Sequence, residues 1–251
     1  FSKRFFKAVM SVLIAFCLFS SLFSLSVWAT EDNSGDGQGE DNSEASTTDD
    51  GSQKLQRTIL LDEYPENPPL IDGTAYILYD AQSKTFLVGD DCDTPLSPAS
   101  TTKVLTILLA LENLDLDGSI TVTEDMYNAI PESYVRLPLV EGEEIPVIDA
   151  IYASMLISAN DACSALAVEM GGSIEGFSEM MNEKARELGC LHSNFTNPYG
   201  LGDPEHLTSV RDMVLILEAA LEYDLFREVA TTSLYTIEAT NKYPDSRTIN
   251  N

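Results

Sequence analysis

Ser100 and Lys103 are the residues of this chain whose types and spacing most clearly predict chemistry. They lie in the string Pro-Ala-Ser-Thr-Thr-Lys at residues 98–103. A serine hydroxyl is a weak nucleophile until a base removes its proton, and a lysine acts as that base only when its pKa falls toward neutrality. A spacing of three at the start of a helix places both side chains on one face. We therefore predict that Ser100 is the nucleophile of an acyl transfer and Lys103 its general base.

The residues around Lys103 favour a lowered pKa for its amine. The positive end of the helix disfavours a protonated lysine, and burial lowers the pKa further against the neighbouring Val104, Leu105 and Leu108. The alternative is that Ser100 only caps the helix and that Lys103 is a solvated residue of its first turn. A lysine there opposes the helix dipole, where Asp or Glu is preferred, so helix stability alone does not explain it.

A second string, Ser158-Ala159-Asn160, follows once in the chain. We predict that the Ser158 hydroxyl relays a proton to the leaving amine. The Asn160 amide would bind the lysine or the peptide carbonyl of the substrate. The alternative is an ordinary turn between two helices in which Asn160 caps the second. The two strings together carry more weight than either alone, because each occurs once.

Apolar helices are expected to position both strings. Residues 101–114 are mostly Leu, Ile, Val and Ala, which predicts a buried helix. Residues 146–157 and 161–170 predict two more, with Ser158-Ala159-Asn160 at their junction. Before them, residues 74–79 and 85–88 are rich in β-branched and aromatic side chains and flank a polar turn, which predicts a β-hairpin.

The second half of the chain predicts further helices and little strand. An amphipathic helix follows Ser173 as its cap, a turn-rich loop spans 197–204, and Ser209 with Asp212 form a capping box for a helix ending near Tyr223. One strand is expected near 234–238. Because two strands do not make a stable sheet alone, we expect the remaining strands to lie beyond Asn251.

Composition divides the chain into three parts. Residues 1–29 combine a basic start, an apolar run and small residues at Val27-Trp28-Ala29, which predicts a signal peptide; an uncleaved membrane anchor is the alternative. Residues 30–54 are acidic and polar, which predicts a disordered linker, and 55–251 form one domain. With 41 acidic and 14 basic residues and a net charge of −27, the chain is not expected to bind nucleic acid.

Cysteine and histidine content argues against a metal site or other cofactor. Removal of the signal peptide leaves Cys92, Cys163 and Cys190, an odd number at wide spacing. Cys163 is expected to be a small core residue, whereas a bridge between Cys92 and Cys190 stays open. The only histidines, His192 and His206, lack the cluster of ligands that zinc requires.

Several strings together resemble the D-alanyl-D-alanine carboxypeptidases, the low-molecular-mass penicillin-binding proteins. The resemblance covers nearly all of residues 58–251 and is carried by Pro98-Ala99-Ser100-Thr101-Thr102-Lys103, Ser158-Ala159-Asn160-Asp161-Ala162, Met181-Asn182-Glu183-Lys184-Ala185, Asn197-Pro198-Tyr199-Gly200-Leu201 and Thr208-Ser209-Val210-Arg211-Asp212. It implies an α/β (α+β) fold of the β-lactamase/transpeptidase type, with a helical subdomain against an antiparallel sheet whose C-terminal strands are missing from this chain.

The same resemblance implies an activity. Ser100 would attack the penultimate D-Ala carbonyl of a peptidoglycan stem peptide, the terminal D-Ala would leave, and water would hydrolyse the acyl-enzyme. Lys103 would be the base, Ser158 the proton relay and Asn160 a ligand of substrate and lysine. Penicillins and other β-lactams would acylate Ser100 in place of the substrate. The implied location is outside the membrane of a bacterial cell, with membrane association through a C-terminal segment as a further option.

One departure from the family pattern matters. A Lys-Thr-Gly string, which in the family binds the substrate carboxylate and lies on a strand that supplies an oxyanion donor, does not occur in the 251 residues. Loss of one such donor costs about 10²–10³ in rate, so we expect residues 30–251 alone to be inactive and to fold poorly.

Rival functions remain open at this point. A class A β-lactamase shares the Ser-x-x-Lys string, but no Glu-x-x-Leu-Asn string follows Asn160 to supply its deacylating glutamate. A D-Ala crosslink endopeptidase would use the same residues. A non-catalytic homologue acting in cell-wall binding or regulation is the alternative of a different class.

Overall fold

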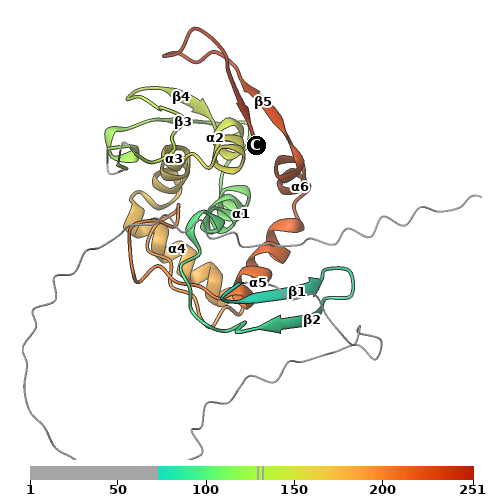
Figure 1. The fold of residues 1–251 in the computed structure, drawn as a ribbon. Helices are drawn as coiled ribbons and strands as arrows, with labels where there is room; N and C mark the ends of the chain where they lie inside the picture. The colour runs from blue at the N-terminus through green and yellow to red at the C-terminus, as the bar shows by residue number, and fades with distance from the viewer. Residues whose placement is uncertain (1–72, 129, 132) are drawn as a thin grey trace, which may run out of the picture.

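The computed structural model describes residues 73–251 except 129 and 132. It is a mixed α/β structure in which a group of helices surrounds α1 and three small two-stranded antiparallel sheets lie around it (Figure 1). The predicted signal peptide at 1–29 and linker at 30–54 lie outside the described residues. Within the described residues no helix is both long enough and apolar enough to cross a membrane.

Six α-helices and two 3₁₀ turns make up the helical part of the described residues. The helices are α1 Lys103–Asn113, α2 Val147–Leu156, α3 Asn160–Gly171, α4 Ile174–Glu187, α5 Val210–Leu221 and α6 Asp224–Thr231, and the turns are η1 Ala99–Thr102 and η2 Glu124–Met126. Because η1 runs directly into α1, the two form one helical element that starts just before Ser100.

Helix α1 is central because it is apolar on nearly every side. It contacts α2, α3, α4 and α5, and the side chains of Leu105, Ile107 and Leu108 have no exposed surface. Burying a leucine or isoleucine side chain stabilises the folded state by about 1.5–3 kcal/mol. This packing fixes the helix that carries both Ser100 and Lys103.

The strands pair into three separate ladders in the described part of the chain. The elements are β1 Tyr76–Asp80 with β2 Thr85–Asp90, β3 Ser119–Thr121 with β4 Glu144–Pro146, and β5 Leu234–Ile237 with β6 Arg247–Asn250. Strand β1 contacts α5, whereas β5 and β6 both contact α2. The β1–β2 and β5–β6 hairpins therefore lie against different helices, toward opposite ends of the molecule (Figure 1).

The predicted elements are largely confirmed. The first hairpin, the buried helix and the two helices around Ser158-Ala159-Asn160 all occur within a few residues of the predicted positions, and Ser173 caps α4 by accepting the Gly176 N–H at 3.0 Å. The short strands β3, β4 and β6 were not predicted, and neither was the eight-residue α6, whereas the four-residue β5 lies where a strand was expected. Such short segments show too few repeats for a period to be recognised.

The predicted capping box at α5 is only half correct. The Ser209 hydroxyl accepts the Asp212 N–H at 3.1 Å as expected. The Asp212 carboxylate instead accepts the backbone N–H of His192 at 2.7 Å and the Ser193 hydroxyl at 2.7 Å. A buried carboxylate favours several donors over one, so this side chain ties α5 to the 190–193 turn.

The cysteines of the described chain are unpaired. Cys92, Cys163 and Cys190 are free thiols, so the bridge that the sequence left open between Cys92 and Cys190 is not formed. Cys163 is completely buried, which confirms its prediction as a core residue.

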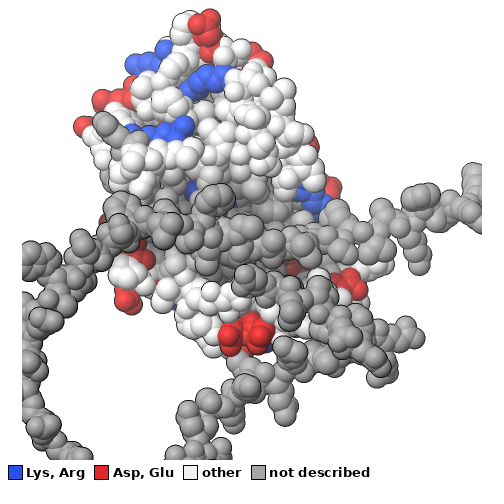
Figure 2. Space-filling view, viewed as in Figure 1, with Lys and Arg blue, Asp and Glu red and all other residues white. Residues whose placement is uncertain are grey.

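Charged side chains on the surface are unevenly spread on the face shown in Figure 2. Acidic groups lie at both ends of this face. Basic groups gather toward the end formed by the β3–β4 and β5–β6 sheets. Strand β3 at this end contacts α3, the helix that starts at Asn160.

Candidate active site

The structure brings the four predicted site residues together. The Ser158 hydroxyl donates to Ser100 Oγ at 3.0 Å. Lys103 Nζ lies 3.3 Å from Ser100 Oγ and 3.0 Å from Asn160 Oδ1. Ser100 is exposed at the surface, whereas Lys103 and Asn160 are each only 3 % exposed. The exposed Ser100 hydroxyl therefore lies within hydrogen-bond distance of the buried Lys103 amine.

Burial sets the electrostatics of Lys103. Loss of water around the amine lowers the pKa of Lys103 below its ordinary value. In the neutral amine, two N–H groups can donate to fixed acceptors and the lone pair is left to face Ser100 Oγ. The arrangement can therefore hold an amine in the orientation that takes a proton from the serine hydroxyl.

One of those two acceptors was not predicted from the sequence. The backbone carbonyl of Tyr199 accepts from Lys103 Nζ at 3.2 Å. A backbone carbonyl carries no residue-type signal, so only the string that shapes its loop could have indicated it. That string, Asn197-Pro198-Tyr199-Gly200-Leu201, was predicted as a turn-rich loop and as part of a resemblance, with no role at Lys103.

Asn197 shapes the loop from inside. Its Oδ1 accepts the backbone N–H of Tyr199, Gly200 and Leu201 at 3.2, 2.7 and 3.3 Å. The same loop binds the nucleophile helix through the Thr106 hydroxyl, which donates to the Pro198 carbonyl at 2.7 Å. These bonds hold the Tyr199 carbonyl in place against Lys103.

Two residues next to the Ser100 hydroxyl, one preceding it in the chain and one contacting it across the site, have an unfavourable backbone conformation. Ala99 has φ 48° and Ser158 has φ 57°, in the left-handed region that usually costs an L-residue about 1–2 kcal/mol. Two such residues flank one hydroxyl. Backbone strain of this kind is concentrated at functional sites, so both residues support this location for the site.

Gly200 is required where its loop touches the nucleophile turn. It has φ +83°, and a Cβ there would lie 1.8 Å from the Ala99 carbonyl oxygen and 2.4 Å from Thr102 Oγ1. We expect Gly200→Ala to lower the free energy of unfolding by about 2–4 kcal/mol, from left-handed strain and overpacking. Because the clash displaces the turn that carries Ser100, penicillin acylation should slow about 10²-fold. Stopped-flow acylation and urea denaturation measure the two effects.

Gly202 provides the matched control. It has φ +81°, but the nearest atom to its added Cβ is Tyr134 Oη at 3.9 Å. Gly202→Ala should therefore lose only the conformational part, about 1–2 kcal/mol, and keep the parental acylation rate. Equal acylation rates in the two variants would show that the Gly200 contact does not position the nucleophile.

His206 is a buried residue that holds the 196–202 loop against the turn carrying Ser100, and the sequence analysis did not predict this role. Its Nδ1 accepts the Thr196 N–H at 3.0 Å, so Nε2 carries the proton and donates to Thr102 Oγ1 at 2.8 Å. Burial lowers the pKa of His206 to about 4. The neutral imidazole thus links the 196–202 loop to the residue before Lys103.

This depressed pKa predicts a loss of stability in weak acid. In the unfolded chain histidine takes up its proton near pH 6.5, whereas folded His206 does so only near pH 4. Between these values the unfolded state binds more protons, so the free energy of unfolding falls as pH drops from about 6.5 to 4, by up to about 3 kcal/mol. Urea denaturation at pH 7, 6 and 5 measures it.

His206→Gln is the reference for that titration, because glutamine offers one acceptor and one donor but does not titrate in this range. Its free energy of unfolding should fall less steeply than that of the parent between pH 7 and 5. Parallel curves would show that His206 is not the residue responsible.

Comparisons with known proteins agree on one family. The family profile described as D-alanyl-D-alanine carboxypeptidase (peptidase S11) matches residues 62–250. D-alanyl-D-alanine carboxypeptidase DacF of Bacillus subtilis is 32% identical over 175 residues, covering 68% of this chain and 45% of its own. D-alanyl-D-alanine carboxypeptidase DacC of Escherichia coli is 34% identical over 182 residues, covering 69% and 45%. This chain therefore spans about half the length of these relatives.

Solved structures show the same fold. The crystal structure of the Streptomyces K15 DD-transpeptidase superposes with a TM-score of 0.65 at 28% identity, covering 70% of this chain and 72% of that one. Penicillin binding protein 5 from Haemophilus influenzae superposes with a TM-score of 0.66 at 27% identity, covering 74% and 54%. The predicted transpeptidase-like fold is therefore confirmed.

Proposed function

The chain belongs to the D-alanyl-D-alanine carboxypeptidase family, and on that premise we propose that its protein is a serine-type carboxypeptidase that removes the terminal D-alanine from peptidoglycan stem peptides. One observation carries the proposal: the exposed Ser100 hydroxyl lies within hydrogen-bond reach of both Ser158 Oγ and the buried Lys103 amine. A nucleophile, a base and a relay are thereby present in one place.

The proposed reaction starts with acylation. Ser100 Oγ attacks the carbonyl of the penultimate D-Ala as its proton passes to Lys103 Nζ, which the Asn160 and Tyr199 oxygens hold in place. The tetrahedral intermediate collapses, the peptide C–N bond breaks, and the departing amine of D-Ala takes a proton from Lys103 through the Ser158 hydroxyl. Ser100 is left as an ester of the shortened peptide.

Deacylation completes the cycle. Water attacks the ester carbonyl, Lys103 accepts the water proton, and that proton returns to Ser100 Oγ as the ester C–O bond breaks. One peptide bond and one water are consumed, and free D-Ala and a shortened stem peptide are formed. No metal or cofactor takes part in this proposal.

β-Lactams are the proposed inhibitors of the same site. Ring opening by Ser100 would form an ester in which the leaving nitrogen stays attached and blocks the approach of water.

The predicted leader at 1–29 supports a location outside the membrane, where the stem peptides lie. Attachment to that membrane through a further segment is part of the same proposal.

The test is D-Ala release from a synthetic acyl-D-Ala-D-Ala peptide. It uses the product of the complete gene beside the 251-residue chain, because the family's Lys-Thr-Gly string does not occur in these residues. Stoichiometric D-Ala release and long-lived penicillin labelling support the proposal. Rapid penicillin hydrolysis would instead indicate a β-lactamase, cleavage restricted to crosslinked muropeptides an endopeptidase, and wall binding without turnover or labelling a non-catalytic protein.

A further inference from the structure

A single backbone carbonyl orients the Asn160 side chain. Val135 O accepts both the backbone N–H of Asn160 at 2.9 Å and its side-chain Nδ2 at 3.0 Å. Because the amide nitrogen is held there, the amide oxygen must point the other way, and it accepts from Lys103 Nζ at 3.0 Å. If Val135 moved, the amide could rotate and present its NH₂ group to the lysine instead of an acceptor.

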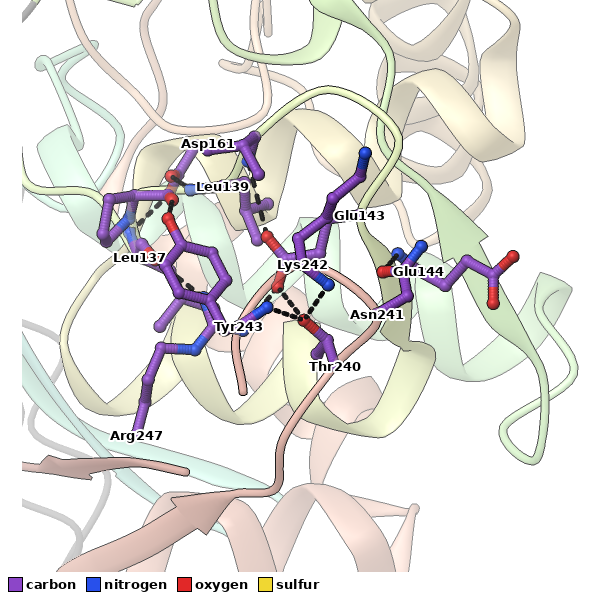
Figure 3. Close-up of polar contacts among 12 residues, drawn as sticks. Leu137, Leu139, Glu143, Glu144, Asp161, Thr240, Asn241, Lys242, Tyr243 and Arg247 are labelled. Atoms are coloured by element: carbon purple, nitrogen blue, oxygen red, sulfur yellow. Dashed lines mark hydrogen bonds and ion pairs between the residues drawn. The ribbon is translucent and has the colours of Figure 1, made fainter. Parts of the chain in front are cut away.

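We name residues 135–143 the bracing segment. On one side this segment is hydrogen-bonded to α3. The buried Asp161 carboxylate accepts the backbone N–H of Leu137 at 2.8 Å and of Leu139 at 3.0 Å (Figure 3). Asp161 directly follows Asn160. The residue that the segment orients and the residue that holds the segment are thus neighbours in the first turn of α3.

On its other side the bracing segment is bound by an ion pair and a hydrogen bond from Arg247 of β6. Arg247 Nη2 lies 2.5 Å from Glu143 Oε1, and Arg247 Nη1 donates to the Leu137 carbonyl at 3.3 Å. Glu143 has no exposed surface, so its charge depends on partners inside the protein. One guanidinium therefore neutralises one end of the segment and holds a carbonyl two residues from Val135.

The turn between β5 and β6 adds contacts to the same segment. Thr240 Oγ1 donates to Glu143 Oε1 at 3.1 Å, and Asn241 Nδ2 donates to the Gly142 carbonyl at 2.8 Å. The Tyr243 hydroxyl donates to the Pro138 carbonyl at 2.6 Å while its ring lies under the Arg247 guanidinium at 4.3 Å. Figure 3 shows these side chains converging on the bracing segment from the hairpin.

We propose that Arg247 is a positioning residue for the acylation step: it holds the bracing segment against α3 so that Val135 keeps the Asn160 amide oxygen on Lys103. The inference rests on the proposed function for its catalytic meaning. Arginine suits this role because its two terminal nitrogens, held apart in one rigid plane, reach two acceptors that do not converge on a single point, Glu143 Oε1 and the Leu137 carbonyl.

Arg247→Lys separates positioning from charge neutralisation. A lysine still neutralises Glu143 but loses the bond to the Leu137 carbonyl, so the midpoint of urea unfolding should stay close to that of the parent. Penicillin acylation should slow about 10-fold, and the rising limb of its pH profile should shift, because the amine has lost an oriented acceptor. Arg227→Lys is the matched control, since Arg227 pairs with Asp224 at 2.9 Å on α6 and should leave all readouts unchanged.

Amide hydrogen exchange tests the same inference without any activity. In Arg247→Lys the backbone N–H of Leu137, Leu139 and Asn160 should exchange about 10-fold faster, while those of α1 stay as in the parent. If the lysine variant does not fold, Arg247→Met with Glu143→Gln removes both charges together and serves in its place.

The outcomes separate the two proposals. Parental acylation rate, pH profile and exchange in a folded variant would overturn the role of Arg247. If penicillin does not acylate the parent, which for these experiments is the product of the complete gene, the proposed function is overturned, whereas the exchange result still decides whether Arg247 holds the bracing segment. Faster exchange with unchanged acylation would overturn the positioning role and leave a structural contact only.

Discussion

Replacing Ser100 by alanine in the product of the complete gene is expected to abolish covalent labelling by penicillin and to lower D-Ala release by on the order of 10⁴-fold or more. The reason is that, among the described residues, Ser100 is the serine whose hydroxyl hydrogen-bonds to Lys103 Nζ, whereas the Ser158 hydroxyl donates to Ser100 Oγ. Ser100 is exposed, so the free energy of unfolding should change by no more than about 0.5 kcal/mol. Intact-protein mass spectrometry after penicillin treatment measures the labelling.

Ser97→Ala is the control for the serine prediction. Ser97 lies three residues earlier and is also exposed, so its removal tests whether any nearby hydroxyl matters, and labelling should remain complete. If the Ser100→Ala protein still gains one penicillin mass, and peptide mapping places it on Ser158, then the nucleophile has been assigned to the wrong serine.

Replacing Lys103 by methionine is expected to slow acylation by about 10²–10⁴-fold, the usual contribution of a general base. Methionine is similar in length and unbranched, so it fills the same buried space without a proton acceptor. Lys103→Arg should be as inactive, because arginine keeps the positive charge but does not deprotonate. The parent's acylation rate should rise with pH as Lys103 loses its proton, and neither variant should show that limb.

The lysine substitution also carries a stability signature with a definite sign. Burial places the pKa of folded Lys103 below its unfolded value near 10.5. In the window just below that value the unfolded state binds the extra proton, so the parent loses stability as pH falls from about 10.5 toward the folded pKa. The methionine variant lacks this term and should gain stability relative to the parent over the same window, as followed by urea denaturation.

Lys184→Met is the control for both lysine effects. Lys184 lies on α4 and pairs with Glu112 at 2.7 Å, away from Ser100, so its removal should leave acylation unchanged. Acylation by Lys103→Met at the parental rate would rule out Lys103 as the base, and a pH profile kept in Lys103→Arg would assign that limb to another group.

Residue type and spacing alone were enough to pair Ser100 with Lys103 as the predicted nucleophile and base. Ser100 and Lys103 were paired by a spacing that local helix geometry turns into proximity, and the apolar residues after Lys103 predicted the lowered pKa that burial produces. The caps at Ser173 and Ser209 were predicted for the same reason, because a capping bond joins residues three positions apart.

The pairing of distant segments had no such local signal. Ser158 and Asn160 were connected to Ser100 by the pairing of two strings and by a family resemblance, not by local geometry, and it is the packing of α2 and α3 on α1 that places them there. The contacts of Asp212 were predicted incorrectly, since its carboxylate binds the 190–193 turn across the fold rather than its own cap.

What the sequence determined by itself is therefore which side chains could react, in the form of a predicted nucleophile and a predicted base on one apolar helix. What only the tertiary structure decided is the orientation of that chemistry. The Tyr199 carbonyl, the Val135 carbonyl and the neutral His206 imidazole fix the amine, the amide and the nucleophile turn. Two of the three are backbone atoms that every residue type carries, so their roles depend on where the chain is held in space.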